Sequence, residues 1–297
     1  MQIITNTNNR EEKEHGSFSF PVYISIEQIQ AYDQGTFLWH WHPEIELTWI
    51  MSGEMEYQIN DTTYKLSAGD GIFGNSNSLH TGRRINGSQC TYLSITFHPR
   101  FLYGYENSIL QTKYVSFITS NDSWSSLPLK QEIEWQKHIL DTLKEIYTLS
   151  QNPADDYEIV VHQKIMDIWH KLYLYYSVQP ERGNKTLIHV QRLREILSFI
   201  HENYATDISL EDIADSTSLS KSECCRFFKK HMNMTIFDYI LYYKIQKSLP
   251  LLVTDQSITD IAFTVGFSSA SYYTQIFKRY MKCTPLQYKK SSFANNF

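Results

Sequence analysis

The sequence predicts an α+β protein of at least two domains, with a barrel of short β-strands followed by helices and an all-helical domain at its end. Two patterns indicate this organisation. Residues 18–100 alternate short β-branched and aromatic runs with turn residues, which is typical of a sandwich or barrel. Residues 187–291 contain two copies of a helix-turn-helix pattern. A length of 297 residues suits two domains.

The first segment, residues 1–17, is polar and acidic, and we expect a flexible arm because chain termini of this kind usually fray. The barrel is expected over residues 18–128. Its clearest strands are 45–50, 55–59 and 63–66, with a hairpin turn at Asn60-Asp61.

A histidine-rich motif lies within these strands. Its spacing is His40-x-His42-x3-Glu46-x6-Gly53, followed by Ala68-Gly69-Asp70 and then His80. This spacing resembles the two motifs of the cupin β-barrel, although Asn75 and Asn77 stand where proline and glycine are expected. In metal-binding cupins the matching residues would be three histidines and a glutamate that point into the barrel. Imidazole and carboxylate groups suit Zn, Fe, Mn or Ni. Use as pocket or strand residues is the favoured interpretation, with a metal site as the alternative.

Aromatic side chains surround this motif and predict a pocket for a small molecule. An aromatic wall with a few histidines and carboxylates suits a sugar or another cyclic metabolite, although aromatic rings also fill barrel cores. The candidate ligand-binding residues are His40, His42, Glu46, His80, Trp39 and Tyr57.

Two amphipathic helices are predicted after the barrel, within residues 129–178. Apolar residues recur at helical spacing in residues 131–150 and 156–178, with Asn152-Pro153 as the break between them. These helices could pack on the barrel or expose an apolar stripe to a second subunit. The polar segment 179–186, which holds Pro180 and Gly183, is expected to be an interdomain linker.

The two helix-turn-helix copies are separated by 48 to 49 positions. Ile261-Ala262 and the segment 277–284 repeat Ile213-Ala214 and the segment 228–235. In the second copy, Gly266 would permit the positive φ of a tight turn, and Ser268 or Ser269 could cap the following helix. Residues 236–252 are apolar enough to form a helix between the copies, with Pro250 near its end.

Residues 190–290 resemble the AraC/XylS family of bacterial transcription regulators, most strongly over IAFTVGFSSASYYTQIFKRYMKCTP. The resemblance implies binding to double-stranded promoter DNA, a cupin-like domain that senses a small-molecule effector, a homodimer, and contact with RNA polymerase if the protein is an activator. The chain departs from the family pattern at Ser218, Asn233, Lys282, Lys244 and Ser248.

The candidate DNA-binding residues lie on the outward face of the second helix in each helix-turn-helix copy. Those of the first copy are Lys221, Ser222, Cys225, Arg226 and Lys229, and those of the second are Ala270, Ser271, Thr274, Gln275 and Lys278. Arg226 is suited to guanine and Gln275 to adenine, whereas Lys229 and Lys278 are suited to phosphates. A solvated helix face would carry similar residues.

Charge is distributed unevenly along the chain. The net charge is −5, but residues 185–297 hold 14 Lys and Arg against 10 Asp and Glu, a net charge of +4, which leaves −9 for residues 1–184. This asymmetry favours DNA contact through the C-terminal domain. The four cysteines form no CxxC pair, no apolar run is long enough for a membrane span, and the N-terminus resembles no signal peptide. We expect a cytoplasmic protein without a cofactor or membrane partner.

The sequence therefore favours a transcription regulator rather than an enzyme. One alternative is a metal-dependent cupin enzyme that uses His40, His42, Glu46 and His80, although it leaves the duplicated helix-turn-helix unexplained. A second alternative is a DNA-binding protein without a ligand, whose barrel serves only as a dimer scaffold.

Overall fold

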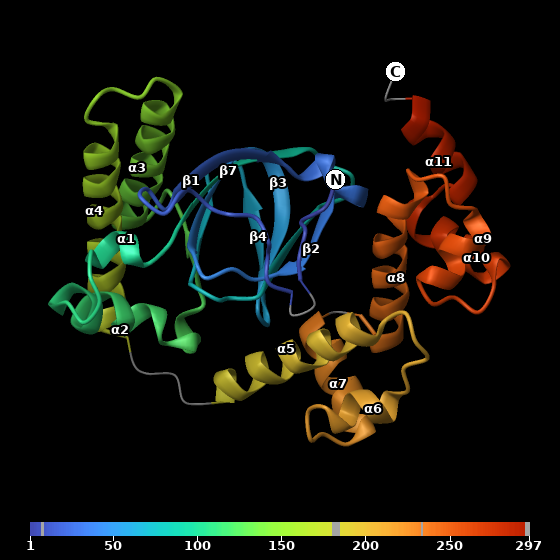
Figure 1. Ribbon diagram of the computed structural model, residues 1–297. Coiled ribbons are helices and arrows are strands. Elements are labelled where there is room, and N and C mark those ends of the chain that lie inside the picture. The colour runs from blue at the N-terminus through green and yellow to red at the C-terminus, as the bar shows by residue number, and fades with distance from the viewer. Residues whose placement is uncertain (7–8, 180–184, 233, 295–297) are drawn as a thin grey trace. The chain divides into compact units, whose positions relative to one another are not determined.

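The computed structural model describes residues 1–6, 9–179, 185–232 and 234–294 (Figure 1). The chain divides into two compact units, residues 1–190 and 191–297. The first contains the strands and the second is helical, as the sequence predicted. None of the described helices combines the length and the apolar composition needed to cross a membrane.

The first unit is built on eight antiparallel strands, and the long strand β3 pairs with four of the others. The strands are β1 (Val22–Gln28), β2 (Thr36–His40), β3 (Ile45–Ile59), β4 (Thr62–Ser67), β5 (Gly71–Gly74), β6 (His80–Arg84), β7 (Cys90–Phe97) and β8 (Ser126–Leu129). The first half of β3 pairs with β5 and β7, which continue to β8 and β1. Its second half pairs with β4 and β6, and β6 continues to β2. The two halves thus form the two walls of a barrel.

The continuity of β3 corrects the prediction of separate strands at 45–50 and 55–59. The strand continues through a bulge between Ile50 and Ser52 and through Gly53, whose φ is 78°. A Cβ atom at Gly53 would lie 1.9 Å from the Gln89 carbonyl oxygen, so only glycine fits this bend. The predicted hairpin at Asn60-Asp61 is confirmed, since Ile59 pairs with Thr62 and Asn60 has a φ of 50°.

The alternation of side chains along the strands gives the larger wall one apolar and one polar face. Leu47 of β3 and Leu93 and Ile95 of β7 belong to the core shared with the helices. The intervening residues, Glu46 of β3 and Ser94 of β7, line a cavity on the other face. The larger wall therefore lies between the core shared with the helices and the cavity, while a second apolar cluster that includes Phe37, Met55 and Tyr92 belongs to the barrel itself.

Two long helices cover the apolar face, α3 (Glu134–Gln151) and α4 (Tyr157–Ser177), which lie side by side in Figure 1. They contribute residues such as Leu143 and Trp169 to the same core as the sheet. Packing within one subunit, one of the two predicted alternatives, is thus observed. Shorter elements connect the rest: η1 (Ile29–Ala31), η2 (Asp33–Gly35), α1 (Arg100–Tyr103), η3 (Leu110–Val115), α2 (Ser116–Thr119) and η4 (Asp122–Trp124).

The second unit contains two helix-turn-helix pairs, a helix between them and one further helix at each end, the first of which begins before the boundary at residue 190. Its elements are α5 (Lys185–Asn203), α6 (Leu210–Asp215), α7 (Lys221–Met232), α8 (Ile236–Leu252), α9 (Ile258–Thr264), α10 (Ala270–Met281) and α11 (Pro285–Ala294). The pairs are α6–α7 and α9–α10, and α8 is the predicted connecting helix. Pro250 lies inside α8, close to its end.

The turns of the two pairs adopt the expected left-handed backbone conformation. Gly266 has a φ of 79°, and Ser218 at the matching position has a φ of 54°. Ser269 caps α10 by accepting a hydrogen bond from the Tyr272 amide. Lys282, another departure from the family pattern, ends α10 with a φ of 60°. Asn233 lies outside the described residues.

Candidate functional site

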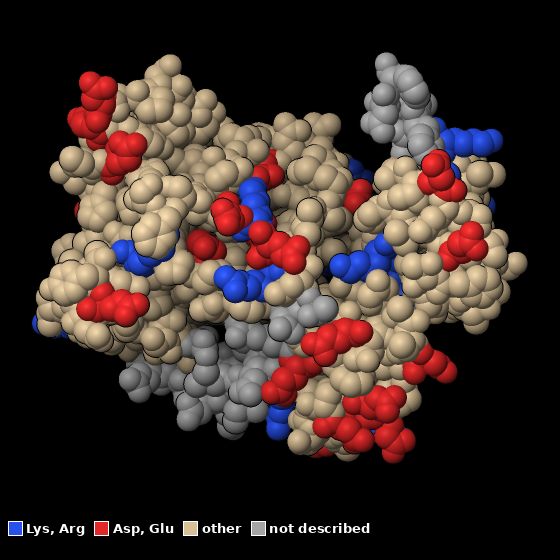
Figure 2. All heavy atoms as spheres, viewed as in Figure 1, with Lys and Arg blue, Asp and Glu red and all other residues tan. Residues whose placement is uncertain are grey.

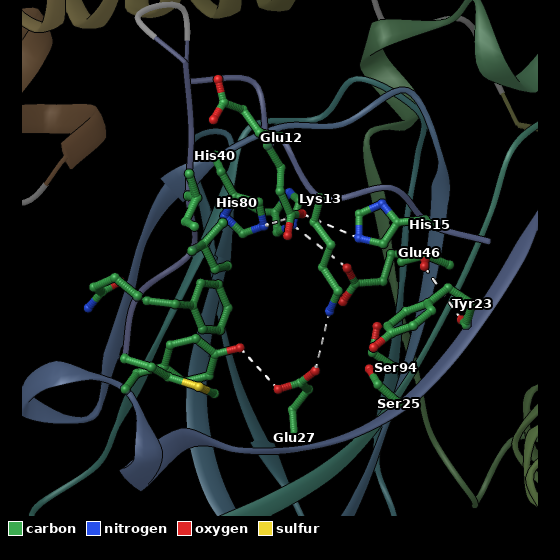
Figure 3. Close-up of a pocket in the computed structure, with 18 of the residues that line it drawn as sticks. Glu12, Lys13, His15, Tyr23, Ser25, Glu27, His40, Glu46, His80 and Ser94 are labelled. Atoms are coloured by element: carbon green, nitrogen blue, oxygen red, sulfur yellow. Dashed lines mark hydrogen bonds and ion pairs between the residues drawn. The ribbon is translucent and has the colours of Figure 1, made fainter. Parts of the chain in front are cut away.

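The barrel contains an open cavity of about 500 Å³ (Figure 3). Polar residues from β1, β7 and the first half of β3 form one side, including Glu27, Ser94 and Glu46, and Tyr57 from the second half of β3 and His80 of β6 form another. The lining combines carboxylates, imidazoles, hydroxyls and aromatic rings. A cavity of this size falls within the range of about 300–1,000 Å³ that is typical of small-molecule sites.

Residues of the N-terminal arm form part of the lining of this cavity. The Glu11 amide donates a hydrogen bond to the Trp41 carbonyl (2.9 Å), and the Glu12 amide donates one to the Ile4 carbonyl (2.9 Å). These bonds fold the arm into a hairpin beside β2. Lys13 extends from the arm into the cavity, where its ammonium lies 4.3 Å from the centre of the Tyr23 ring.

The structure brings together the four residues of the histidine motif. His40 of β2 and His80 of β6 are paired in register, and their ring centroids are 4.1 Å apart. His42 lies 5.1 Å from His80 by the same measure. The Glu46 Oε2 atom is 3.4 Å from His42 Nε2 and 3.8 Å from His80 Nε2. All three histidines are buried.

Backbone carbonyls fix the tautomers of two of these histidines. The Nδ1 atom of His40 lies 2.9 Å from the Leu38 carbonyl oxygen, and that of His80 lies 2.8 Å from the Ser78 carbonyl oxygen. Each Nδ1 must therefore carry the proton that it donates, and each Nε2 presents a lone pair. The ligand atoms of His40, His42 and His80 lie within 4.8 Å of one another. With Glu46, these residues have the chemistry to hold a transition metal.

The three imidazoles differ in the direction in which their pKa is shifted. Burial, together with the neighbouring imidazoles, lowers the pKa of His40 well below its usual value, and burial lowers the pKa of His80 to about 4. Burial also opposes protonation of His42, but the carboxylates of Glu46, Glu11 and Glu44 together outweigh it and raise the His42 pKa. Burial raises the pKa of Glu46, and the two nearby imidazoles reverse that effect and lower it. Glu46 is thus an anion beside one histidine that readily accepts a proton.

Glu46 is held in place by two hydroxyl groups. Its Oε1 atom accepts hydrogen bonds from Tyr57 (2.9 Å) and Thr48 (2.7 Å). Tyr57 also lines the cavity, as do His40, Glu46 and His80. Of the other predicted ligand-binding residues, His42 belongs to the histidine cluster but is not part of the lining. Trp39 is buried and is not part of the lining.

Sequence reasoning missed several polar residues that face the same interior. Glu27 accepts a hydrogen bond from Tyr32 (3.1 Å), and Glu11 of the arm lies 3.8 Å from His40 Nε2. The alternating pattern of Tyr23, Ser25 and Glu27 on β1 was a signal that could have identified the β1 residues. The position of Glu11 carries no such signal, because it depends on how the arm folds back.

The helical unit presents the ten candidate DNA-binding residues on its α7 and α10 surfaces. The apolar sides of these helices are buried at Phe228, Tyr273 and Phe277. All ten candidates are exposed or half-buried: Lys221, Ser222, Cys225, Arg226, Lys229, Ala270, Ser271, Thr274, Gln275 and Lys278. Lys221 is engaged in an ion pair with Glu211 (2.7 Å).

Two departures from the family pattern support the second turn. The Lys244 ammonium of α8 donates a hydrogen bond to the Gly266 carbonyl (2.6 Å), and the Tyr273 hydroxyl of α10 donates one to Ser248 Oγ (2.9 Å). A Cβ atom at Gly266 would lie 2.4 Å from the Ala205 carbonyl oxygen. The position of α10 is therefore fixed by α8 and by a residue that must be glycine.

The charge of the helical unit is not uniform. On the face drawn in Figure 2, acidic side chains gather near α6, where Glu211, Asp212 and Asp215 are exposed. Phosphates are repelled by such a surface, so the acidic region near α6 is unsuited to DNA contact. Arg226 and Lys229 lie on the following helix, α7.

Comparisons with known proteins agree with this division into two parts. A family model described as an AraC-like ligand binding domain matches residues 24–159, and a helix-turn-helix domain model matches residues 213–291. The HTH-type transcriptional regulator YdeC of Bacillus subtilis is 36% identical over 289 residues, which cover 97% of this chain and 98% of that protein.

Two further comparisons are more distant. The melibiose operon regulatory protein of Escherichia coli K12 is 26% identical over 260 residues, covering 85% of this chain and 83% of that protein. A crystal structure of ToxT from Vibrio cholerae covers 91% of this chain and 97% of that one, with a TM-score of 0.42 and 14% identity.

Proposed function

Because this chain belongs to the AraC family of transcription regulators, we propose that its cavity binds a small polar metabolite, such as a sugar. Binding of this effector would alter promoter recognition by α7 and α10. The observation that carries the proposal is the cavity of about 500 Å³, in which hydroxyl, imidazole and carboxylate groups lie among aromatic and aliphatic side chains.

The chemistry of the lining supports a ligand rich in hydroxyl groups. Glu27 and Glu46 supply acceptors, Lys13 supplies a donor, and Tyr23 and Tyr57 supply aromatic rings. A sugar offers both hydroxyl groups and an apolar face, so it would use both kinds of contact. The name of one relative refers to a melibiose operon, and a disaccharide is therefore a reasonable first compound to test.

The arm is the segment whose conformation a bound metabolite would change. A ligand shifts a conformational equilibrium only if it binds the alternative states with different affinity. Arm residues Lys13 and His15 line the cavity, so a bound metabolite would contact the arm directly. We therefore expect the effector response to disappear when residues 2–16 are deleted, whereas an unchanged response would remove the arm from the mechanism.

A thermal-shift screen of the full chain against sugars and sugar acids tests the proposed ligand class. A binding metabolite should raise the unfolding temperature, because saturation at 100 times Kd adds about 2.7 kcal/mol. Glu46→Gln should abolish the shift. The matched control is Glu54→Gln on the same strand, where Glu54 pairs with Lys65 (2.7 Å) outside the cavity lining. No shift at millimolar concentration with any compound would favour a barrel without a ligand.

The expected partners are promoter DNA, a second copy of the chain and, for an activator, RNA polymerase. Although α3 and α4 pack on the sheet, Ile159 and Leu174 of α4 are 66% and 53% exposed. We propose that this surface supports a homodimer. Sedimentation should then show a dimer that becomes a monomer in the Ile159→Glu and Leu174→Glu double variant. A wild-type monomer at micromolar concentration would contradict this proposal.

A further inference from the structure

A second group of potential metal ligands joins the arm to the barrel. It consists of His15 from the arm, together with His42 and Glu44 from the connection between β2 and β3. Its ligand atoms lie within 4.8 Å of one another. His15 and His42 are buried, and their ring centroids are 4.9 Å apart. This group shares only His42 with the histidine motif.

The distances within this group match the coordination shell of a small divalent cation. Glu44 Oε2 lies 3.4 Å from His15 Nδ1 and 3.5 Å from His42 Nδ1. Bonds of about 2.0–2.2 Å from zinc to nitrogen and oxygen place tetrahedral ligand atoms about 3.4 Å apart. The Glu44 oxygen thus lies at the spacing expected of tetrahedral ligands from each of the two imidazole nitrogens.

The Nε2 atoms of His15 and His42, which face away from Glu44, each lie near another carboxylate. Such carboxylates orient histidine ligands in metal sites. His15 Nε2 lies 3.4 Å from Glu11 Oε2, and His42 Nε2 lies 3.4 Å from Glu46 Oε2. If these nitrogens carry the protons, both Nδ1 atoms present lone pairs toward Glu44. The carboxylates of Glu11, Glu44 and Glu46 would then offset the charge of a divalent cation.

His42 supplies a second observation that points to a ligand. Both of its ring nitrogens are buried, and neither completes a well-formed hydrogen bond among the described residues, although carboxylate oxygens lie 3.4 and 3.5 Å away. A buried polar atom without a partner is costly unless an ion or water completes it. The site can be reached from outside, because His15 and Glu44 also line a second cavity of about 640 Å³ together with His98 and Arg100.

We propose that His15, His42 and Glu44 bind a zinc-type divalent cation that clamps the arm to the barrel. His15 Nδ1, His42 Nδ1 and a Glu44 carboxylate oxygen are three of the ligands, and water from the second cavity completes the tetrahedron. The cation would hold the arm in its place in the lining of the first cavity. This inference is independent of the effector, because it concerns the junction between arm and barrel.

Calorimetric titration of the metal-free full chain with zinc chloride tests the site. We expect wild-type protein to bind one equivalent, and His15→Ala and Glu44→Gln each to weaken that binding at least tenfold. His15→Cys should restore much of the affinity, because a thiolate also binds zinc. His138→Ala is the matched control, since His138 pairs with Asp167 on the α3–α4 surface.

Limited proteolysis of the same proteins reports on the arm. Zinc should slow cleavage after Glu12 and Glu14 at least tenfold in wild-type protein and have no effect in His15→Ala. Circular dichroism identifies any variant that fails to fold, and His15→Cys then decides the result. The proposal is overturned if wild-type protein binds no zinc, if both His15→Ala and Glu44→Gln retain wild-type affinity, or if affinity is lost only in His80→Ala. Effector binding and DNA binding are not measured, so this test can fail while the proposed function stands.

Discussion

Individual residues show which parts of the sensor site could be predicted from sequence. His40 ends β2, His42 lies two positions beyond it, and His80 pairs directly with His40, so these residues meet as the resemblance to the cupin motif implied. Glu11, His15 and Glu44 could not be predicted. Their contacts depend on the path of the arm and of a short connection, and neither has a periodic pattern.

Ser218 in the first helix-turn-helix pair carries local backbone strain. A left-handed backbone conformation costs a residue other than glycine about 1–2 kcal/mol, a strain that glycine avoids. Glycine in turn loses about 0.5–1 kcal/mol of stability, because its backbone is freer in the unfolded chain. Ser218→Gly should therefore stabilise the helical unit by about 0.5–1 kcal/mol in urea unfolding. Ser216→Gly is the control, since Ser216 has a φ of −61° and should lose stability. Destabilisation by both changes would show that Ser218 is unstrained.

His201 makes the stability of the helical unit depend on pH. Its Nε2 lies 2.8 Å from the Tyr239 hydroxyl oxygen, and its ring stacks on Tyr243 at 3.7 Å. Burial, with a smaller effect of Lys247, lowers the His201 pKa well below its ordinary value of 6.5. The unfolded chain therefore binds a proton first as the pH falls, so stability present above pH 6.5 is lost below it.

The expected loss approaches about 1.4 kcal/mol for each pH unit below the unfolded pKa. Thermal unfolding at pH 7.5 and pH 5.5 measures it, and His201→Gln should show a smaller difference between the two conditions than wild-type protein. His138→Gln, which changes an exposed histidine, should behave as wild type. The same pH dependence in wild type and His201→Gln would exclude this residue as the cause.

At the scale of elements, the helices were predicted more accurately than the barrel. The apolar spacing that predicted residues 131–150 and 156–178 corresponds to α3 and α4, because helix faces repeat within a short segment. The prediction for β3 was wrong in its length. Ser52-Gly53 reads locally as a turn, but strand pairing on both sides continues through it. Such long-range pairing is not encoded in any short window of sequence.

On the second helix of each helix-turn-helix pair, we expect some side chains to contact bases and others to contact phosphates. Arg226→Ala and Gln275→Ala should each cost about 1–3 kcal/mol on a cognate promoter and much less on random DNA. Lys278→Ala should weaken both equally and reduce the salt dependence of binding by about one unit of slope. Fluorescence anisotropy with both DNAs at several salt concentrations measures these effects.

Arg279→Ala is the control for this series, because Arg279 is next to Lys278 but pairs with Asp238 of α8 (3.1 Å). It should change affinity little. Equal losses on both DNAs for Arg226→Ala, Gln275→Ala and Lys278→Ala would contradict the assignment of base contacts to the first two.

The whole molecule combines a barrel of predominantly acidic sequence with a more basic helical unit. The difference between −9 for residues 1–184 and +4 for residues 185–297 follows the boundary between sensing and DNA binding. The fold class was predictable at this scale because each part has its own repeating pattern. The effector was not, because its identity depends on side chains from β1, β3, β6, β7 and the arm that meet only in the folded barrel.

The most direct test of the regulatory claim joins the two units in one measurement. Genomic DNA fragments selected by the protein itself are titrated with the full chain, with and without the metabolite that gives the largest thermal shift. A coupling free energy of about 1–3 kcal/mol predicts a change in Kd of about 5–150-fold, and Glu46→Gln should lose it. Identical Kd values at saturating metabolite, in a protein that binds both ligands, would contradict the account.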